Sequence, residues 1–158
     1  MIPIQQSSLA SYFEDIQPAD ADVKDVFVLD PQEAKSEWER LFAVGSKGLH
    51  DLPNDCWVQQ CRWENIGNWI NSYNGQEDPL SVADLIQKES GWEDDQALLL
   101  VQGGVSMVTL PFRCFGRYWP DLFAAYDDGP ILLKKGLGGV AFRFVPMGHI
   151  LRCSHIGM

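Results

Sequence analysis

The feature that most constrains the fold is a series of short apolar runs between Ala97 and His155. Gly and Pro separate these runs every five to ten residues. Short runs rich in Val, Leu, Phe and Ile between such breaks are typical of consecutive antiparallel strands. We therefore expect strands at 97–102, 105–110, 122–126, 130–135, 139–145 and 149–154, with the upstream residues forming helices and loops that cover the sheet.

The breaks between these runs predict particular turns. Gly103-Gly104 suits a two-residue hairpin turn with positive φ, and Pro146 to His149 is typical of a tight turn. The aromatic-rich insert between Pro111 and Pro120 predicts a helical turn. Side chains alternate between the two faces of a strand. In the last run this places His149, Leu151, Cys153 and His155 on one face, and Ile150, Arg152 and Ser154 on the other.

Helices are predicted before residue 97. Asp30-Pro31-Gln32-Glu33 combines a capping box with proline at the first helical position, which favours a helix over 31–44. Apolar spacing predicts further helices at 62–73 and from Ser81 to about Gly91, and a short helix from Ser7 or Ser8 to Pro18. The fold class is then α+β, in one domain spanning 1–158: a largely antiparallel five- or six-stranded C-terminal sheet flanked by about three N-terminal helices.

Composition bounds the class of protein. At 158 residues and 46% hydrophobic content, the chain can bury one sizeable core. It has no apolar window of about 18 residues and no secretory signal pattern, so we expect a cytoplasmic protein. The irregular spacing of the cysteines in a chain of this size predicts reduced thiols and no disulfides. The four are Cys56, Cys61, Cys114 and Cys153.

Charge is distributed unevenly along the chain. The net charge is −10, yet residues 1–102 carry six Lys/Arg against nineteen Asp/Glu, whereas residues 103–158 carry six against three. An acidic surface repels phosphate backbones and anionic lipids, which disfavours nucleic acid and membranes as partners. A general need for solubility explains acidity equally well. The asymmetry favours a cationic partner.

Several segments together resemble a known family. DPQEAKSEWERLF, LPNDCW, an insert ending RYWPDLF and the following DDGPILL are similar to small bacterial cytosolic proteins of unknown function with a DDGPLL-type turn. The likeness spans about residues 26–145, and it implies no activity. In size, acidity and a helix-flanked antiparallel sheet, the chain is also similar to immunity proteins, which neutralise toxins in the bacterial cytoplasm.

No motif in the sequence indicates catalysis or a cofactor. Cys153 and His155 share a strand face, but His149 lies about 13 Å from Cys153 at strand rise, which is too far to complete a zinc site. A cysteine nucleophile, Cys114 or Cys153, would need a nearby imidazole. Asp127-Asp128-Gly129-Pro130 is better explained as a turn than as a carboxylate pair, and Lys134-Lys135 as a solvated strand end. We expect no enzyme, metal or cofactor.

The tryptophans suggest a binding surface. Trp57, Trp63 and Trp69 cannot all share one helix face, so at least one is expected at the surface, where an aromatic ring beside carboxylates forms an interface hot spot. Ordinary core packing is the other interpretation. The predicted partner-binding residues are Asp51, Asp55, Trp57, Trp63, Glu64, Trp69, Glu77 and Asp78.

The leading hypothesis is a cytoplasmic immunity protein that occludes a basic toxin domain, such as a nuclease, and is a monomer when free. One alternative is a small-ligand-binding domain or hydrolytic enzyme with a pocket near the 111–130 insert. Its lining would include Arg113, Arg117, Tyr118 and Asp127. A housekeeping interaction protein is the third possibility.

Overall fold

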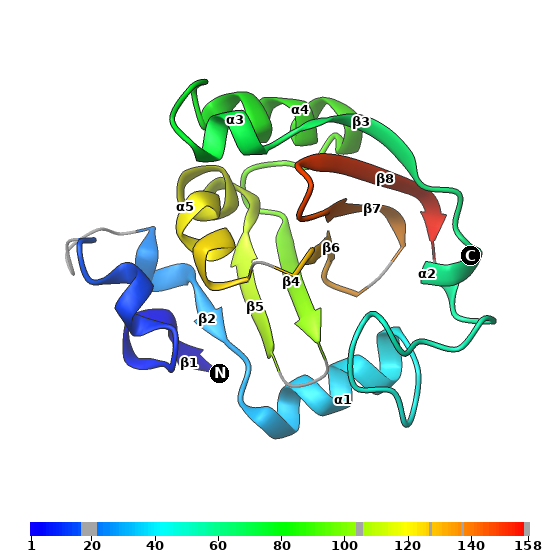
Figure 1. Ribbon diagram of the computed structural model, residues 1–158. Coiled ribbons are helices and arrows are strands. Elements are labelled where there is room, and N and C mark those ends of the chain that lie inside the picture. The colour runs from blue at the N-terminus through cyan, green and yellow to red at the C-terminus, as the bar shows by residue number, and fades with distance from the viewer. Residues whose placement is uncertain (17–21, 104–105, 127, 137, 157–158) are drawn as a thin grey trace.

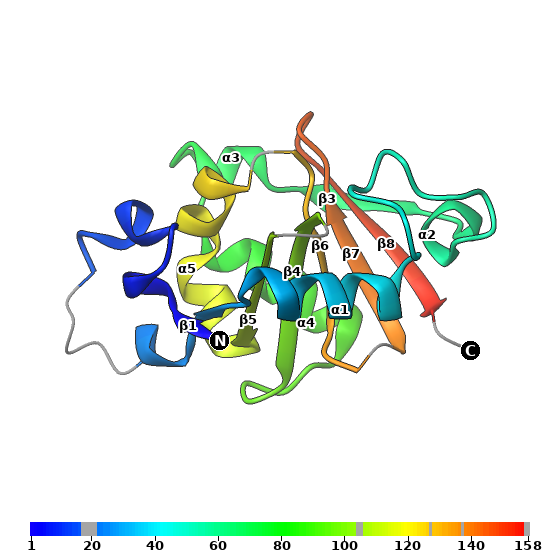
Figure 2. The same ribbon diagram turned by 90° about the horizontal axis from the view of Figure 1, so that it is seen from below.

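One antiparallel sheet with helices on both faces forms the centre of the molecule (Figures 1 and 2). The computed structural model describes residues 1–16, 22–103, 106–126, 128–136 and 138–156. Within these residues the sheet has eight strands in the order β1-β2-β5-β4-β6-β7-β8-β3. They are β1 (Ile2–Pro3), β2 (Phe27–Val28), β3 (Glu64–Asn68), β4 (Ala97–Gly103), β5 (Ser106–Pro111), β6 (Ile131–Lys134), β7 (Gly139–Phe144) and β8 (His149–Ile156).

The mixed α and β composition and the antiparallel sheet are confirmed, but the predicted numbers of strands and helices differ from those in the described residues. Three strands outside the predicted set, β1, β2 and β3, extend the C-terminal strands at both edges of the sheet. The described residues contain five α-helices, and one of them lies in the C-terminal part. The helices are α1 (Pro31–Leu41), α2 (Trp57–Gln60), α3 (Ile70–Tyr73), α4 (Leu80–Ser90) and α5 (Phe112–Ala125).

Five of the six predicted strands are present at the centre of the sheet. β4 and β5 form a hairpin in which Leu100 lies opposite Val108, while the expected turn residue Gly104 is outside the described residues. The turn between β7 and β8 is also confirmed, since the Gly148 amide donates to the Val145 carbonyl at 2.9 Å. Gly148 has φ of +103°, which an L side chain rarely adopts.

The sixth predicted strand, 122–126, was wrong because these residues complete α5. Pro120 suggested a helix end before this run, yet the helix continues through it. Burial explains why. Phe112, Phe115, Trp119 and Leu122 recur on one helical face, and each is at most 5% exposed. This packing offsets the cost of about 3 kcal/mol that proline brings to a helix interior.

The helix predicted at 62–73 was also wrong. Residues Glu64–Asn68 form the edge strand β3, paired with β8 with a bulge between Asn65 and Gly67, and only Ile70–Tyr73 is helical. The exposed edge of β8 offers this backbone hydrogen-bonding partners, whereas Asn and Gly are poor helix formers. The near-helical spacing of Trp63, Ile66 and Ile70 comes from this strand, bulge and short helix in succession.

The other upstream predictions are largely confirmed. The Asp30 carboxylate accepts from the amides of Gln32 at 3.1 Å and Glu33 at 2.9 Å, and the Glu33 carboxylate accepts from the Asp30 amide at 3.2 Å. α4 begins near Ser81 as expected. The N-terminal segment differs, because it forms short 3-10 turns, η1 (Ile4–Gln6), η2 (Ala10–Phe13) and η3 (Val23–Asp25), in place of an α-helix. No helix in the described ranges is long and apolar enough to cross a membrane.

The two faces of the sheet carry separate cores. On the α5 face, α4, α5 and the N-terminal turns pack on alternate strand residues such as Leu100, Leu132 and Phe142. On the α1 face, α1 and the segment 49–63 pack on the intervening residues, including Leu99, Ile131 and Cys153. Figure 2 shows α1 crossing its face of the sheet.

Candidate interaction surface

A row of four aromatic rings lines the α1 face from α1 to the start of β3. Trp38 packs on Phe42 with ring centroids 4.5 Å apart, Phe42 on Trp57 at 5.6 Å, and Trp57 on Trp63 at 6.4 Å. Trp38 is buried, as its helical spacing predicted, while Phe42, Trp57 and Trp63 are half-buried. We call these four residues the aromatic row. It brings two of the three predicted surface tryptophans together.

Each indole of the aromatic row is fixed by a hydrogen bond within the chain. The Trp57 ring nitrogen donates to the Leu41 carbonyl at 2.7 Å, and the Trp63 ring nitrogen to the Val58 carbonyl at 3.0 Å. Trp38 donates to the Ser46 hydroxyl at 3.0 Å. With the polar N–H groups used internally, the rings offer apolar surface in a fixed orientation.

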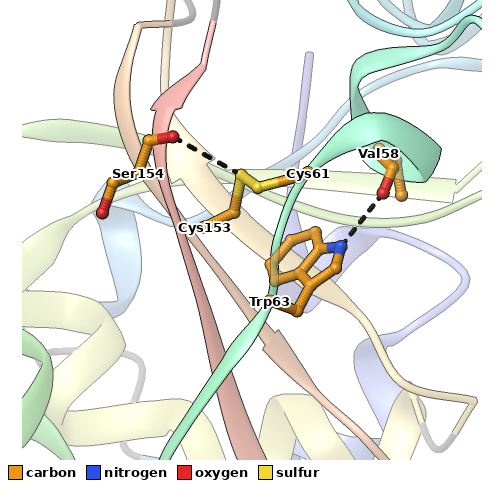
Figure 3. Close-up of a disulfide and its surroundings, with 5 residues drawn as sticks. All are labelled: Val58, Cys61, Trp63, Cys153 and Ser154. Carbon is orange, nitrogen blue, oxygen red and sulfur yellow. Dashed lines mark hydrogen bonds between the residues drawn. A yellow bond between two sulfur atoms is a disulfide. The ribbon is translucent and has the colours of Figure 1, made fainter.

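A disulfide joins this segment to the sheet, contrary to the prediction of reduced thiols. Cys61, between α2 and β3, is bonded to Cys153 of β8 with their Cα atoms 6.0 Å apart. Figure 3 shows this bond beside Trp63 and its hydrogen bond to Val58. The cysteines lie 92 residues apart, and the pairing of β3 with β8 brings them together. Cys56 and Cys114 are buried and take no part in a disulfide within the described residues.

Three of the predicted carboxylates lie in or beside the segment that carries the aromatic row. Asp51 is exposed, and its carboxylate accepts from the amides of Lys47 at 3.0 Å and Gly48 at 2.8 Å, which lowers its pKa. Asp55 is exposed and makes no hydrogen bond or ion pair with any described residue. Glu64 is exposed but bonded to the Arg152 guanidinium at 2.9 Å.

The remaining predicted residues belong to a different place. Trp69 is only 9% exposed and packs in the core of the α5 face, where its ring meets Phe123 edge to face at 5.3 Å. Glu77 and Asp78 lie between α3 and α4, and Asp78 accepts from the Leu80 amide at 2.9 Å at the start of α4. The eight predicted residues therefore do not form one surface.

Folding brings basic side chains of residues 103–158 into contact with carboxylates of the acidic residues 1–102. Arg113 and Arg117 of α5 both pair with Asp22, at 3.3 Å and 2.9 Å, and Arg113 also pairs with Asp25. Arg152 pairs with Glu64 and Glu89. Three of the six cationic side chains of residues 103–158 thus contact carboxylates from the acidic part of the chain.

Of the side chains that the alternative hypothesis placed around a pocket, Arg113 and Arg117 are exposed and ion-paired, whereas Tyr118 is buried. Tyr118 is buried against Phe13, with ring centroids 6.2 Å apart, and Arg113 and Arg117 hold η3 and its flank through ion pairs. Asp127 lies outside the described residues. A shallow hollow of about 220 Å³ lies elsewhere, between Met1, Glu33 and Lys135.

A polar group that the sequence analysis missed lies on β7, β8 and β3. Arg143 of β7 is half-buried, and burial lowers its pKa. Nearby, the Asn65 amide nitrogen is 3.0 Å from Nδ1 of His149. Arginine inside an apolar strand, GVAFRFV, is the signal that could have drawn attention to this position, because a strand core seldom accommodates a charge.

The fold and this surface define an α+β protein with a helix-covered antiparallel sheet and a rigid aromatic row on one face. A family model described as "Protein of unknown function (DUF2947)" matches residues 5–146. The chain therefore belongs to that family, which agrees with the resemblance to a family of unknown function seen in the sequence. No curated protein and no solved structure matches the chain.

Proposed function

We propose that the chain is an immunity protein that binds and occludes a cationic toxin domain, most concretely a nuclease. The observation that carries the proposal is the aromatic row, in which Phe42, Trp57 and Trp63 are half-buried, the two indoles are held by internal hydrogen bonds, and Phe42 stacks on Trp57. Rigid aromatic rings that are already oriented lose little entropy on binding, and they are frequent interface hot spots.

Charge supports the choice of a cationic partner. Asp51 and Asp55 are exposed in the segment that carries the row, and the whole chain has a net charge of −10. Carboxylates at the rim of an interface speed the approach of a basic surface, while desolvated aromatic rings slow dissociation. In this mechanism the row covers the partner's basic active site and excludes its substrate.

The experiment begins from the gene directly upstream. Its product should carry a basic C-terminal domain whose expression arrests growth, and co-expression of this chain should restore growth. Asp55→Lys tests the charge, because Asp55 has no partner among the described residues whose loss would disturb the fold. Asp94→Lys, beside the first turn of α5, is the matched control, since it reverses an exposed carboxylate on the other face.

Binding kinetics separate the two contributions. We expect Asp55→Lys to lower the association rate about tenfold at low salt, with the difference disappearing at high salt. Trp57→Ala should raise the dissociation rate on the order of thirtyfold, equivalent to about 2 kcal/mol. Tyr12→Ala, which removes a ring that is 44% exposed on another segment, should change neither rate. Equal effects of Asp55→Lys and Asp94→Lys, or an upstream product that is harmless to the cell, would refute the proposal.

A further inference from the structure

Arg143 is a half-buried cation with no counter-ion among the residues that the structure describes. Its neighbours in sequence, Phe142 and Phe144, belong to the core of the α5 face, so strand alternation places Arg143 on the α1 face. The Nε atom is buried without a hydrogen-bond partner, and the guanidinium forms no ion pair within the described residues. Because guanidinium remains charged in proteins, this position holds an uncompensated positive charge.

Arg152 on the neighbouring strand shows what the chain supplies to a structural arginine. It lies opposite Phe142 and projects from the other face of the sheet. Its Nε is buried without a hydrogen-bond partner, like that of Arg143, but its guanidinium is bonded to two carboxylates, Glu64 at 2.9 Å and Glu89. A partly buried charge destabilises the fold unless an opposite charge lies beside it, and for Arg152 the two carboxylates provide that charge. For Arg143 the pairing group is missing.

Two further donors lie on the same face as Arg143, His149 on the neighbouring strand and Asn65 on the strand beyond it. Leu151 of β8 is opposite both Arg143 and Asn65, which makes His149 a diagonal neighbour of Arg143 and within reach of a long side chain. The Asn65 side-chain oxygen accepts from the Gly67 amide at 3.2 Å, so the amide nitrogen faces Nδ1 of His149. Nδ1 is then the acceptor, and the neutral imidazole carries its hydrogen on Nε2, where it remains available as a donor.

We propose that Arg143, with His149 and Asn65, binds a small oxyanion, a carboxylate or a phosphate, on the α1 face of β7 and β8. Arginine presents a planar fork of N–H groups that matches two oxygens of such an ion, and the imidazole and amide add donors at its side. This site goes beyond the proposed function and does not depend on it, because it needs an anionic ligand and not a cationic partner.

Thermal unfolding with two probes tests the site and identifies the chemistry. Inorganic phosphate and citrate are titrated separately into the protein at constant ionic strength, with chloride as the reference. We expect one of them to raise the melting temperature saturably, by on the order of several degrees once the ion greatly exceeds its dissociation constant. A response to phosphate alone assigns a phosphate ligand, and a response to citrate alone assigns a carboxylate.

Three variants locate the effect. Arg143→Met should abolish the saturable shift, and Arg143→Lys should weaken it, because the ammonium keeps the charge and loses the fork. His149→Ala should weaken binding on the order of tenfold. Arg152→Met, the matched control on the opposite face, should leave the shift in place.

Stability without the ion distinguishes a ligand site from a structural arginine. In chloride alone, Arg143→Met should melt at or above the temperature of the unmodified protein, since it removes an unpaired charge. Arg152→Met should melt lower, because it leaves Glu64 and Glu89 without their cation. A loss of stability in Arg143→Met equal to that in Arg152→Met, or no saturable response to either ion, would overturn the proposal.

Discussion

The two faces of the sheet are covered in different ways. On the α5 face, one continuous amphipathic helix buries seven side chains, and its apolar residues need no covalent link. On the α1 face, beyond α1, the cover is an irregular segment that includes only four helical residues. That segment is held by ring stacking, indole hydrogen bonds and the Cys61–Cys153 disulfide. A segment with little secondary structure thus reaches a fixed geometry through side-chain links.

The largest expected effect lies on the α5 face. Phe115 is fully buried and contacts Phe112, Phe123 and Phe144. Phe115→Ala should lower the free energy of unfolding by about 4 kcal/mol, through lost burial and the cavity left behind. Chemical denaturation monitored by circular dichroism measures this change. A loss below about 1 kcal/mol would mean that the helix cover can collapse around the gap, and the contrast between the faces would fail.

The disulfide is the corresponding test on the α1 face. Replacing both Cys61 and Cys153 by serine should lower the free energy of unfolding by about 3 kcal/mol, because the bond closes a long loop in the unfolded chain. Limited proteolysis should then cleave the segment 49–63 before it cleaves α5. Replacing the buried cysteine Cys114, which is not part of the disulfide, by alanine controls for loss of a buried sulfur. Unchanged stability and an unchanged cleavage order would show that packing alone fixes this cover.

The smallest of the three expected effects is a loss of stability at alkaline pH. Burial raises the pKa of Tyr126 to about 12, and its hydroxyl accepts from Ser106 at 2.9 Å. A raised pKa in the folded state means that the contribution to stability is intact below pH 10 and is lost as pH rises toward 12. The loss approaches about 2 to 3 kcal/mol. Tyr126→Phe should remove this dependence on pH. The difference in melting temperature between the Tyr126→Phe variant and the unsubstituted protein should therefore change between pH 9 and 12, a range that contains the ordinary and the raised pKa of the tyrosine.

If the difference in melting temperature between the two proteins stayed the same from pH 9 to 12, the Tyr126 hydroxyl would be more solvated than its burial indicates. The α1 face differs here too, because its Asp51 carboxylate has a lowered pKa, caused by the Gly48 and Lys47 amides. Its contribution is present above the ordinary aspartate pKa and is lost only as pH falls through the lower folded value.

Local signals in the sequence predicted the elements whose stability is local. The capping box at Asp30 identified the start of α1, and Gly148 identified the turn before β8. Elements that depend on distant partners were predicted wrongly. Residues 122–126 are helical because the sheet buries one face of α5, and residues 64–68 are a strand because β8 offers an open edge. Neither condition can be seen within a short window of sequence.

The candidate site was predicted in the same partial way. Trp57 and Trp63 were identified from a surplus of aromatic residues, and they do come together, but Trp69 belongs to the other core. The disulfide and the environment of Arg143 depend on the register of β3, β8 and β7, which composition and spacing do not determine. The charge asymmetry was visible in the sequence, whereas its partial neutralisation by Arg113, Arg117 and Arg152 was not.

The pairing of β3 with β8 has a consequence for the order of assembly on the ribosome. Asn65 precedes its contact residue His149 by 84 positions, so β3 has no strand to pair with until β8 has been synthesised. Until then, residues 64–68 lack the backbone partners that hold them as an extended edge in the folded chain. The nascent sheet therefore remains open along this border until β8 is available to pair with β3.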